Sequence, residues 1–199
     1  MDNSIALTIQ KLYNEFQDQI GAIDNLQIGN HKHLDFISEQ LKQNQQQPSI
    51  DNIVTVEQPI DLNAHFDIKQ SLKKLIDNCS QIGEIIKKSH FIIIKSKEYL
   101  SFSNSTDLNL LCSRGPSQIQ LSIADLVDFM STTLYYYDQD YQMKEEIIND
   151  LTTQYNSNQI QSDQWYSHCL LFKSSPLLNN QDDISDIESR VFLFNNMGK

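Results

Sequence analysis

The sequence has few of the residues from which catalytic and metal-binding motifs are built. Its three cysteines lie far apart and form no Cys-x-x-Cys pair, which argues against a zinc site or a disulfide framework. Its five glycines are isolated, so no phosphate-binding loop and no Gly-x-Ser-x-Gly nucleophile elbow is present. The five histidines lack His-Glu-x-x-His spacing. We therefore expect a protein that is not an enzyme and that uses no cofactor and no metal.

Long apolar runs and positive charge are also scarce. No stretch approaches the roughly 18 apolar residues of a membrane-spanning helix, and the first residues do not resemble a signal peptide. The net charge of −11 repels phosphate backbones, which argues against direct binding of nucleic acid. The lysines best placed to form a basic patch are interpreted as a solvated helix face: Lys87, Lys88, Lys95 and Lys97.

Helical periodicity is what the sequence does contain, beginning with residues 1–42. Apolar residues mostly three or four apart predict one buried seam, made of Ile5, Ile9, Leu12, Phe16, Ile20, Ile23, Leu26, Leu34, Ile37 and Leu41. Glycine disfavours a helix interior by about 1 kcal/mol against alanine. We expect one long helix, or two collinear helices with a weak point near Gly29.

Residues 62–100 carry the most regular heptad pattern in the chain. Its seam consists of Ile68, Leu72, Leu75, Cys79, Ile82, Ile86 and Ile93. Cys79 lies inside this seam, which predicts a small buried apolar residue rather than a reactive thiol. Residues 91–94 have the propensity of a strand, but the helical register before them favours a helix that continues.

A third helix is predicted from the apolar seam of residues 123–151, made of Ile123, Val127, Met130, Leu134, Tyr137, Tyr141, Ile148 and Leu151. If the helix runs on to Asn156, it is about 50 Å long at roughly 1.5 Å per residue. Ser122 is expected to cap its start, with Asp125 as the capping-box partner. Lys144 is the one charge in its apolar seam. It either extends its ammonium into water along a buried stem or meets a carboxylate on a neighbouring helix or partner.

These segments are joined by linkers at 43–61 and 101–121, the second with a strong turn signal at Arg114-Gly115-Pro116. Residues 122–199 then combine the third helix with a helical cap, which closes with a helix over 182–194. The predicted fold is all-α: an elongated antiparallel three-helix bundle or coiled coil with a short C-terminal helical hairpin, forming one structural unit.

Polar residues in the last third of the chain do not suggest catalysis. His168 and Cys169 are adjacent, so on a helix their side chains diverge by about 100°, a poor arrangement for a nucleophile and its base. The acidic residues of the third helix are expected on exposed faces: Asp138, Asp140, Glu145, Glu146 and Asp150.

Part of the third helix resembles the cyclin-dependent kinase 2-interacting protein family. The residues that carry the resemblance are Tyr137, Asp140, Tyr141, Met143, Lys144, Ile147, Asp150 and Leu151. The family continues with a polar insert, an aromatic–aliphatic helix, a proline with two apolar residues and a closing helix. Here these parts look like 156–162, 165–172, 176–178 and 184–194. The chain departs from the family pattern at Phe172, Ser174, Ser175 and Leu177.

The resemblance implies a non-catalytic adaptor in the nucleus, and also in the cytoplasm. It implies protein partners: a complex of AAA-type ATPases that acts in ribosome maturation, and a replication-associated kinase or replisome components in DNA replication and genome maintenance. The alternative, from the heptad pattern, is a coiled-coil structural subunit of a kinetochore, tethering or cytoskeletal complex. The residues predicted to bind a partner are Tyr137, Tyr141, Lys144, Trp165, Phe172, Leu177 and Leu178.

Overall fold

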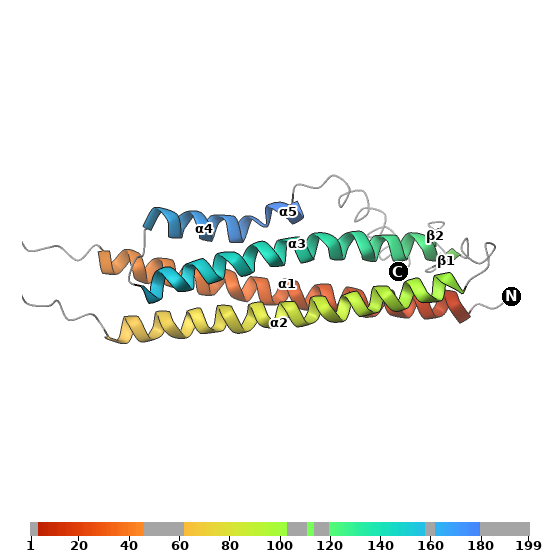
Figure 1. Cartoon of the computed structure of the whole chain (residues 1–199), viewed down its shortest axis with the longest axis horizontal. Coiled ribbons are helices and arrows are strands. Elements are labelled where there is room, and N and C mark those ends of the chain that lie inside the picture. Colours follow the sequence, from red (N-terminus) through yellow and green to blue (C-terminus); the bar gives the residue numbers. More distant parts are fainter. Residues whose placement is uncertain (1–3, 46–61, 103–110, 114–119, 158–161, 180–199) are drawn as a thin grey trace, which may run out of the picture. The chain divides into compact units, whose positions relative to one another are not determined.

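The computed structural model describes residues 4–45, 62–102, 111–113, 120–157 and 162–179. Three long helices account for most of them: α1 (Ser4–Gln45), α2 (Leu62–Ser101) and α3 (Ile123–Asn156) (Figure 1). Two shorter helices follow, α4 (Ser162–Ser174) and α5 (Pro176–Asn179). The prediction of an all-α helical bundle is confirmed. The closing helix predicted over 182–194 lies outside the described residues.

Two short strands add a small element that the periodicity did not predict. Strand β1 (Leu111–Ser113) pairs antiparallel with β2 (Gln120–Ser122), with Leu111 opposite Ser122 and Ser113 opposite Gln120. These residues were predicted to belong to the linker at 101–121, apart from Ser122, which was predicted to cap the third helix. Three residues per strand are too few for the alternation of apolar and polar side chains to be visible in a sequence.

The contacts of the chain group into two compact units. Unit 1 comprises Met1–Ile23, Ile82–Gln142 and Ser175–Lys199, and unit 2 comprises Asp24–Gln81 and Met143–Ser174. Helices α1, α2 and α3 each contribute a segment to both units, and α4 belongs to unit 2. The two units are described separately below.

Unit 1 is built around the predicted apolar seams of its three helix segments. The buried side chains come from α1, α2 and α3 and include Ile9, Phe16, Ile82, Ile86, Ile123, Met130 and Leu134. The rings of Tyr13 on α1 and Phe129 on α3 lie 6.0 Å apart. His90 Nε2 of α2 lies 3.8 Å from Asp138 Oδ2 of α3. Residues 91–94 continue α2, as their register predicted.

The start of α3 is fixed by the capping box that the sequence predicted. The backbone N–H of Asp125 donates to Ser122 Oγ at 3.0 Å, and the backbone N–H of Ser122 donates to Asp125 Oδ2 at 3.0 Å. Two of the N–H groups that a helix start leaves without backbone partners are thereby satisfied.

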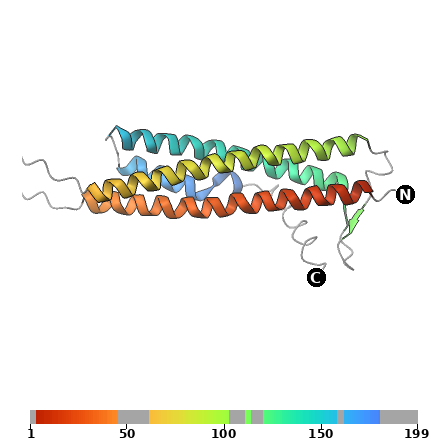
Figure 2. The ribbon, with the colours of Figure 1, turned by 90° about the horizontal axis from the view of Figure 1, so that it is seen from below.

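Unit 2 packs four helix segments, with α2 antiparallel to its neighbours. His65, near the start of α2, stacks on Tyr155, near the end of α3, and the ring centroids are 5.2 Å apart. Farther along α2, the Asn78 side-chain amide donates to Asn30 Oδ1 of α1 at 2.9 Å. Figures 1 and 2 show α4 alongside segments of α1 and α3.

Glycine does not interrupt the long helices. Helix α1 is continuous through Gly29, so the alternative of two collinear helices is wrong. A Cβ at Gly29 would be 3.6 Å from Asn78 Nδ2, an ordinary contact, and one at Gly21 would meet nothing within 4 Å. At Gly83 of α2, in contrast, a Cβ would lie 2.6 Å from Tyr141 Oη. Gly83 therefore makes room for the Tyr141 ring of α3.

We expect Gly21→Ala to stabilise the chain by up to about 1 kcal/mol, because alanine is the better helix former and the space is open. Gly83→Ala should lose this gain, because the new methyl group displaces Tyr141. Thermal unfolding of both variants, and of Gly83→Ala with Tyr141→Phe, measures the difference. Equal stabilisation by the two alanines would contradict the packing of Tyr141 against Gly83.

Candidate functional site: helix α4 and the groove between α2 and α3

Helix α4 is held on α1 by Trp165 and Cys169. The Trp165 indole N–H donates to Ser38 Oγ at 3.3 Å, and Cys169 Sγ lies 3.6 Å from the same oxygen. Both side chains are buried, with Trp165 only 3% exposed. Lys173, in the last turn of α4, forms an ion pair with Asp35 of α1. Trp165 therefore contributes to the packing of unit 2. Its side chain is too buried to offer a surface to the partner that it was predicted to bind.

Phe172 lies between α1 and α3. Its ring meets His31 edge-on at a centroid distance of 6.1 Å, and Lys144 Nζ lies 5.1 Å from its centroid. The side chain is 1% exposed. An ammonium over an aromatic face gains about 0.5–2 kcal/mol, more when both groups are withdrawn from water. Phe172, predicted to bind a partner, is thus a central core residue of unit 2.

Lys144 is buried, so the interpretation in which its ammonium extends into water is wrong. Only 2% of the residue is exposed, so its ammonium does not reach water. Nζ donates to the side-chain carbonyl Gln27 Oε1 on α1 at 3.0 Å. Buried charges require such polar partners, because their desolvation is costly. Lys144 therefore joins α3 to α1 and α4 rather than presenting a charge to solvent.

Asp140 of α3 corrects a second expectation about charge. It was assigned to an exposed acidic face, but it is fully buried, whereas Glu145, Glu146 and Asp150 are exposed as predicted. Asp138 is half-buried beside His90. A helical period places a residue on a face, but the width of the buried face depends on the neighbouring helices.

The remaining predicted partner-binding residues are half-buried. Tyr137 and Tyr141 lie on α3 in unit 1, and Tyr141 packs against Gly83. Leu177 and Leu178 lie on α5, where the Leu178 N–H donates to the Ser175 carbonyl at 2.9 Å. Ser175 has a φ of 40°, a left-handed backbone conformation that ends α4 before Pro176. Binding of a partner by these four residues stays a prediction.

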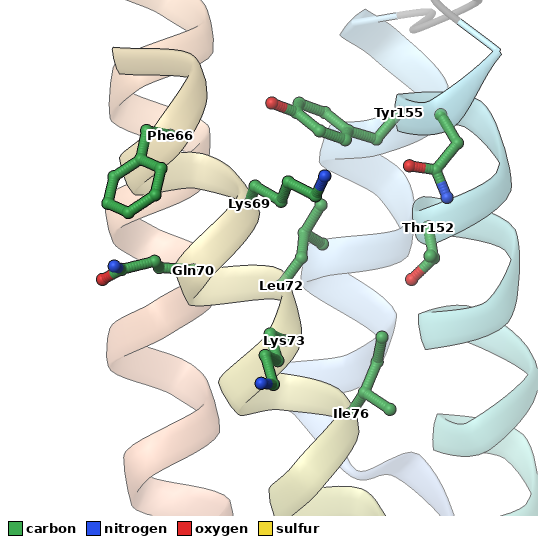
Figure 3. A pocket seen from close by; sticks show the side chains of 9 residues that line it. Phe66, Lys69, Gln70, Leu72, Lys73, Ile76, Thr152 and Tyr155 are labelled. Atoms are coloured by element: carbon green, nitrogen blue, oxygen red, sulfur yellow. The ribbon is translucent and has the colours of Figure 1, made fainter. Parts of the chain in front are cut away.

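A groove opens in unit 2 between the N-terminal part of α2 and the C-terminal part of α3, with a volume of about 380 Å³. In Figure 3, Lys69, Leu72 and Ile76 extend from α2 toward α3, and Tyr155 extends back toward α2. Tyr155 Oη donates to the His65 carbonyl at 3.0 Å and lies 2.6 Å from His65 Nδ1. These bonds fix the phenol ring at one end of the groove.

The sequence analysis missed this groove, although a signal was present. Phe66 and Ile76 are large apolar residues that lie outside the heptad seam of α2, and both are exposed. Phe91 and Ile94, in unit 1, share this property. The apolar seam of a helix is the side that packs against the other helices of the same chain. Large apolar residues off the seam are therefore the signal for a second surface.

The buried cysteines Cys79 of α2 and Cys169 of α4 are protonated thiols at neutral pH. Burial, and secondarily the charge of Glu145, raises the pKa of Cys79 from 9.0 to about 11. Burial is also the main cause that raises the pKa of Cys169. A thiolate is the reactive form, so both groups are poor nucleophiles. The burial of Cys79 in the seam agrees with its prediction.

The raised pKa of Cys79 gives a pH dependence of stability. The neutral thiol favours the folded state fully below pH 9, and this contribution is lost as the pH rises from 9 to about 11. We expect the difference in unfolding free energy between the wild type and Cys79→Ala to shrink over that range. Denaturant unfolding at pH 8 and pH 10.5 measures it. A difference that does not change with pH would contradict the buried, neutral thiol.

Within the described residues, no group of three or more His, Cys, Asp or Glu side chains is placed to hold a metal ion. No helix among them is both long enough and apolar enough to cross a membrane. Comparisons of the chain with models of protein families, with curated proteins and with solved structures find no match.

Proposed function

We propose that this chain is a non-catalytic helical adaptor subunit. On its resemblance to the cyclin-dependent kinase 2-interacting protein family, its partners belong to a nuclear complex with AAA-type ATPases that serves ribosome maturation. Replisome components or a replication-associated kinase are further partners on the same basis. The residues of the resemblance, from Tyr137 to Leu151, fall within α3.

Exposed apolar side chains on the helix faces are the observation that carries the proposal. In unit 1, Phe91 and Ile94 of α2 are 67% and 55% exposed, and Phe102, just beyond α2, is 83% exposed. At 3.6 residues per turn, Phe91 and Ile94 lie on one side of the helix. In unit 2, Tyr166, Leu170 and Leu171 of α4 are also exposed. Clustered exposed apolar groups are typical of protein–protein interfaces.

The alternative function is a coiled-coil structural subunit of a kinetochore, tethering or cytoskeletal complex. Its support was the heptad seam of α2. In unit 2 the seam residues Leu75 and Cys79 are buried within the chain itself, as are Ile82 and Ile86 in unit 1. A seam that is already packed has no free face for coiling with another chain. This favours the adaptor function, in which partner contacts are made by the exposed side of α2 and not by its buried seam.

Affinity capture of the full chain from cells, followed by identification of the recovered proteins, separates the two functions. The adaptor proposal expects AAA-type ATPases with pre-ribosomal or replisome proteins in stoichiometric amounts. Recovery of filament, kinetochore or vesicle-tethering proteins in their place would establish the alternative.

A further inference from the structure

The groove between α2 and α3 in unit 2 is lined by both buried and exposed apolar side chains. Leu72 is buried in the groove, at 4% exposure, and Tyr155 is buried at one end of it, at 6% exposure. Phe66 and Ile76 are 58% and 39% exposed and line the same groove. Leaving two large apolar side chains in water forfeits the free energy of burying them, so their exposure indicates a surface that another molecule covers.

Among the described residues that line the groove, Lys69 and Lys73 are the only charged ones. Both are exposed, and neither forms an ion pair or hydrogen bond with any residue that the structure describes. A positive rim is unusual in a chain whose net charge is −11. Its local charge therefore selects a negatively charged ligand, although the chain as a whole repels one.

The spacing of the exposed groove residues along α2 indicates the length and shape of the ligand. Phe66, Lys69, Lys73 and Ile76 are spaced by three, four and three residues, so their positions follow one stripe along the helix. The stripe is about 15 Å long at roughly 1.5 Å per residue. This length matches about three turns of a second helix laid along the groove, with apolar residues at i, i+3, i+4 and i+7 as its anchors.

We infer that this groove docks an amphipathic helix of a partner protein, whose apolar stripe is flanked by Asp or Glu residues that pair with Lys69 and Lys73. The inference rests on the proposed adaptor function and names the kind of segment that one partner supplies. Apolar anchors provide the affinity, and the two lysines determine which helices are accepted.

The test uses the full chain and two helical probe peptides with the same leucine stripe, one flanked by Glu and the other by Lys. Fluorescence anisotropy should show the Glu-flanked peptide binding about tenfold more tightly, with the preference weakening at high salt. Lys69→Glu combined with Lys73→Glu should invert the preference. Phe66→Ser combined with Ile76→Ser should weaken both peptides by about tenfold or more.

The matched control is Lys95→Glu combined with Lys97→Glu, which changes the net charge equally on exposed residues of α2 outside the groove. It should leave both affinities unchanged. Three outcomes would each overturn the inference. The two charge reversals could have equal effects, the wild type could bind both peptides equally, or the Glu-flanked peptide could fail to bind. Self-association of the chain that is abolished by Lys69→Glu with Lys73→Glu would assign the groove to a second copy and overturn it too.

Cellular capture distinguishes failure of this inference from failure of the proposed function. If the Glu-flanked peptide does not bind while the wild-type chain recovers its ATPase partners, the groove assignment fails and the adaptor function stands. If the wild-type chain recovers no such partners, the adaptor function itself fails.

Discussion

Replacing Phe172 with alanine is expected to lower the free energy of unfolding by about 3–5 kcal/mol. The side chain is 1% exposed and lies between His31 of α1 and Lys144 of α3, so its removal leaves a cavity and withdraws a ring from a buried ammonium. Domains of this kind have total stabilities of about 5–15 kcal/mol, so the loss is a large share. Denaturant unfolding followed by circular dichroism measures the effect.

Leu170→Ala is the matched control on the same helix. Leu170 is 52% exposed, so its truncation should change the free energy of unfolding by no more than about 0.5 kcal/mol. If Phe172→Ala and Leu170→Ala were equally mild, α4 would not be packed on unit 2 as described. Phe172 would then be available to a partner, as the sequence analysis predicted.

Separating Lys144 from Gln27 should have the second large effect. Gln27→Leu removes the carbonyl that accepts from the buried ammonium, and we expect it to cost about 1.5–3 kcal/mol. Adding Lys144→Met removes the buried charge, so the double variant should regain most of the loss. Chemical unfolding of the two single variants and the double variant gives the coupling free energy, expected at about 1–3 kcal/mol.

The control cycle combines Gln27→Leu with Lys32→Met. Lys32 is an exposed lysine of α1, so its coupling to Gln27 should be close to zero. A Lys144 coupling as small as that of Lys32 would show that the bond to Gln27 adds nothing to the packing of α3 on α1.

The sequence predicted those features of the fold that depend on local spacing. The period of apolar residues from Ile123 to Leu151 predicted α3, which begins at Ile123 and ends at Asn156, and the Ser122–Asp125 pair predicted its capping box. The continuous heptad of α2 predicted a buried Cys79. Each of these properties depends on neighbours within one helix, so each can be read from one segment alone.

Features that depend on contacts between helices were not predictable in the same way. The burial of Lys144 depends on Gln27, which is distant in sequence on α1, and the docking of Trp165 depends on Ser38. Asp140 shows a different limit, because its spacing from the buried residues Lys144 and Leu151 places it on the buried face, but a carboxylate is by type expected in water. The seven residues predicted to bind a partner were chosen for size and resemblance. Three of them, Lys144, Trp165 and Phe172, are used by the interior of unit 2.

The adaptor account is tested most directly by capturing partners with a variant that changes only an exposed face. Phe91→Ser combined with Ile94→Ser alters two exposed residues of α2 in unit 1, so the melting temperature of the purified chain should change little. The account predicts that quantitative capture from cells then recovers far less of the ATPase partners than the wild type does. Unchanged recovery with this variant, and with Phe66→Ser combined with Ile76→Ser, would contradict the claim that the exposed apolar faces bind partners.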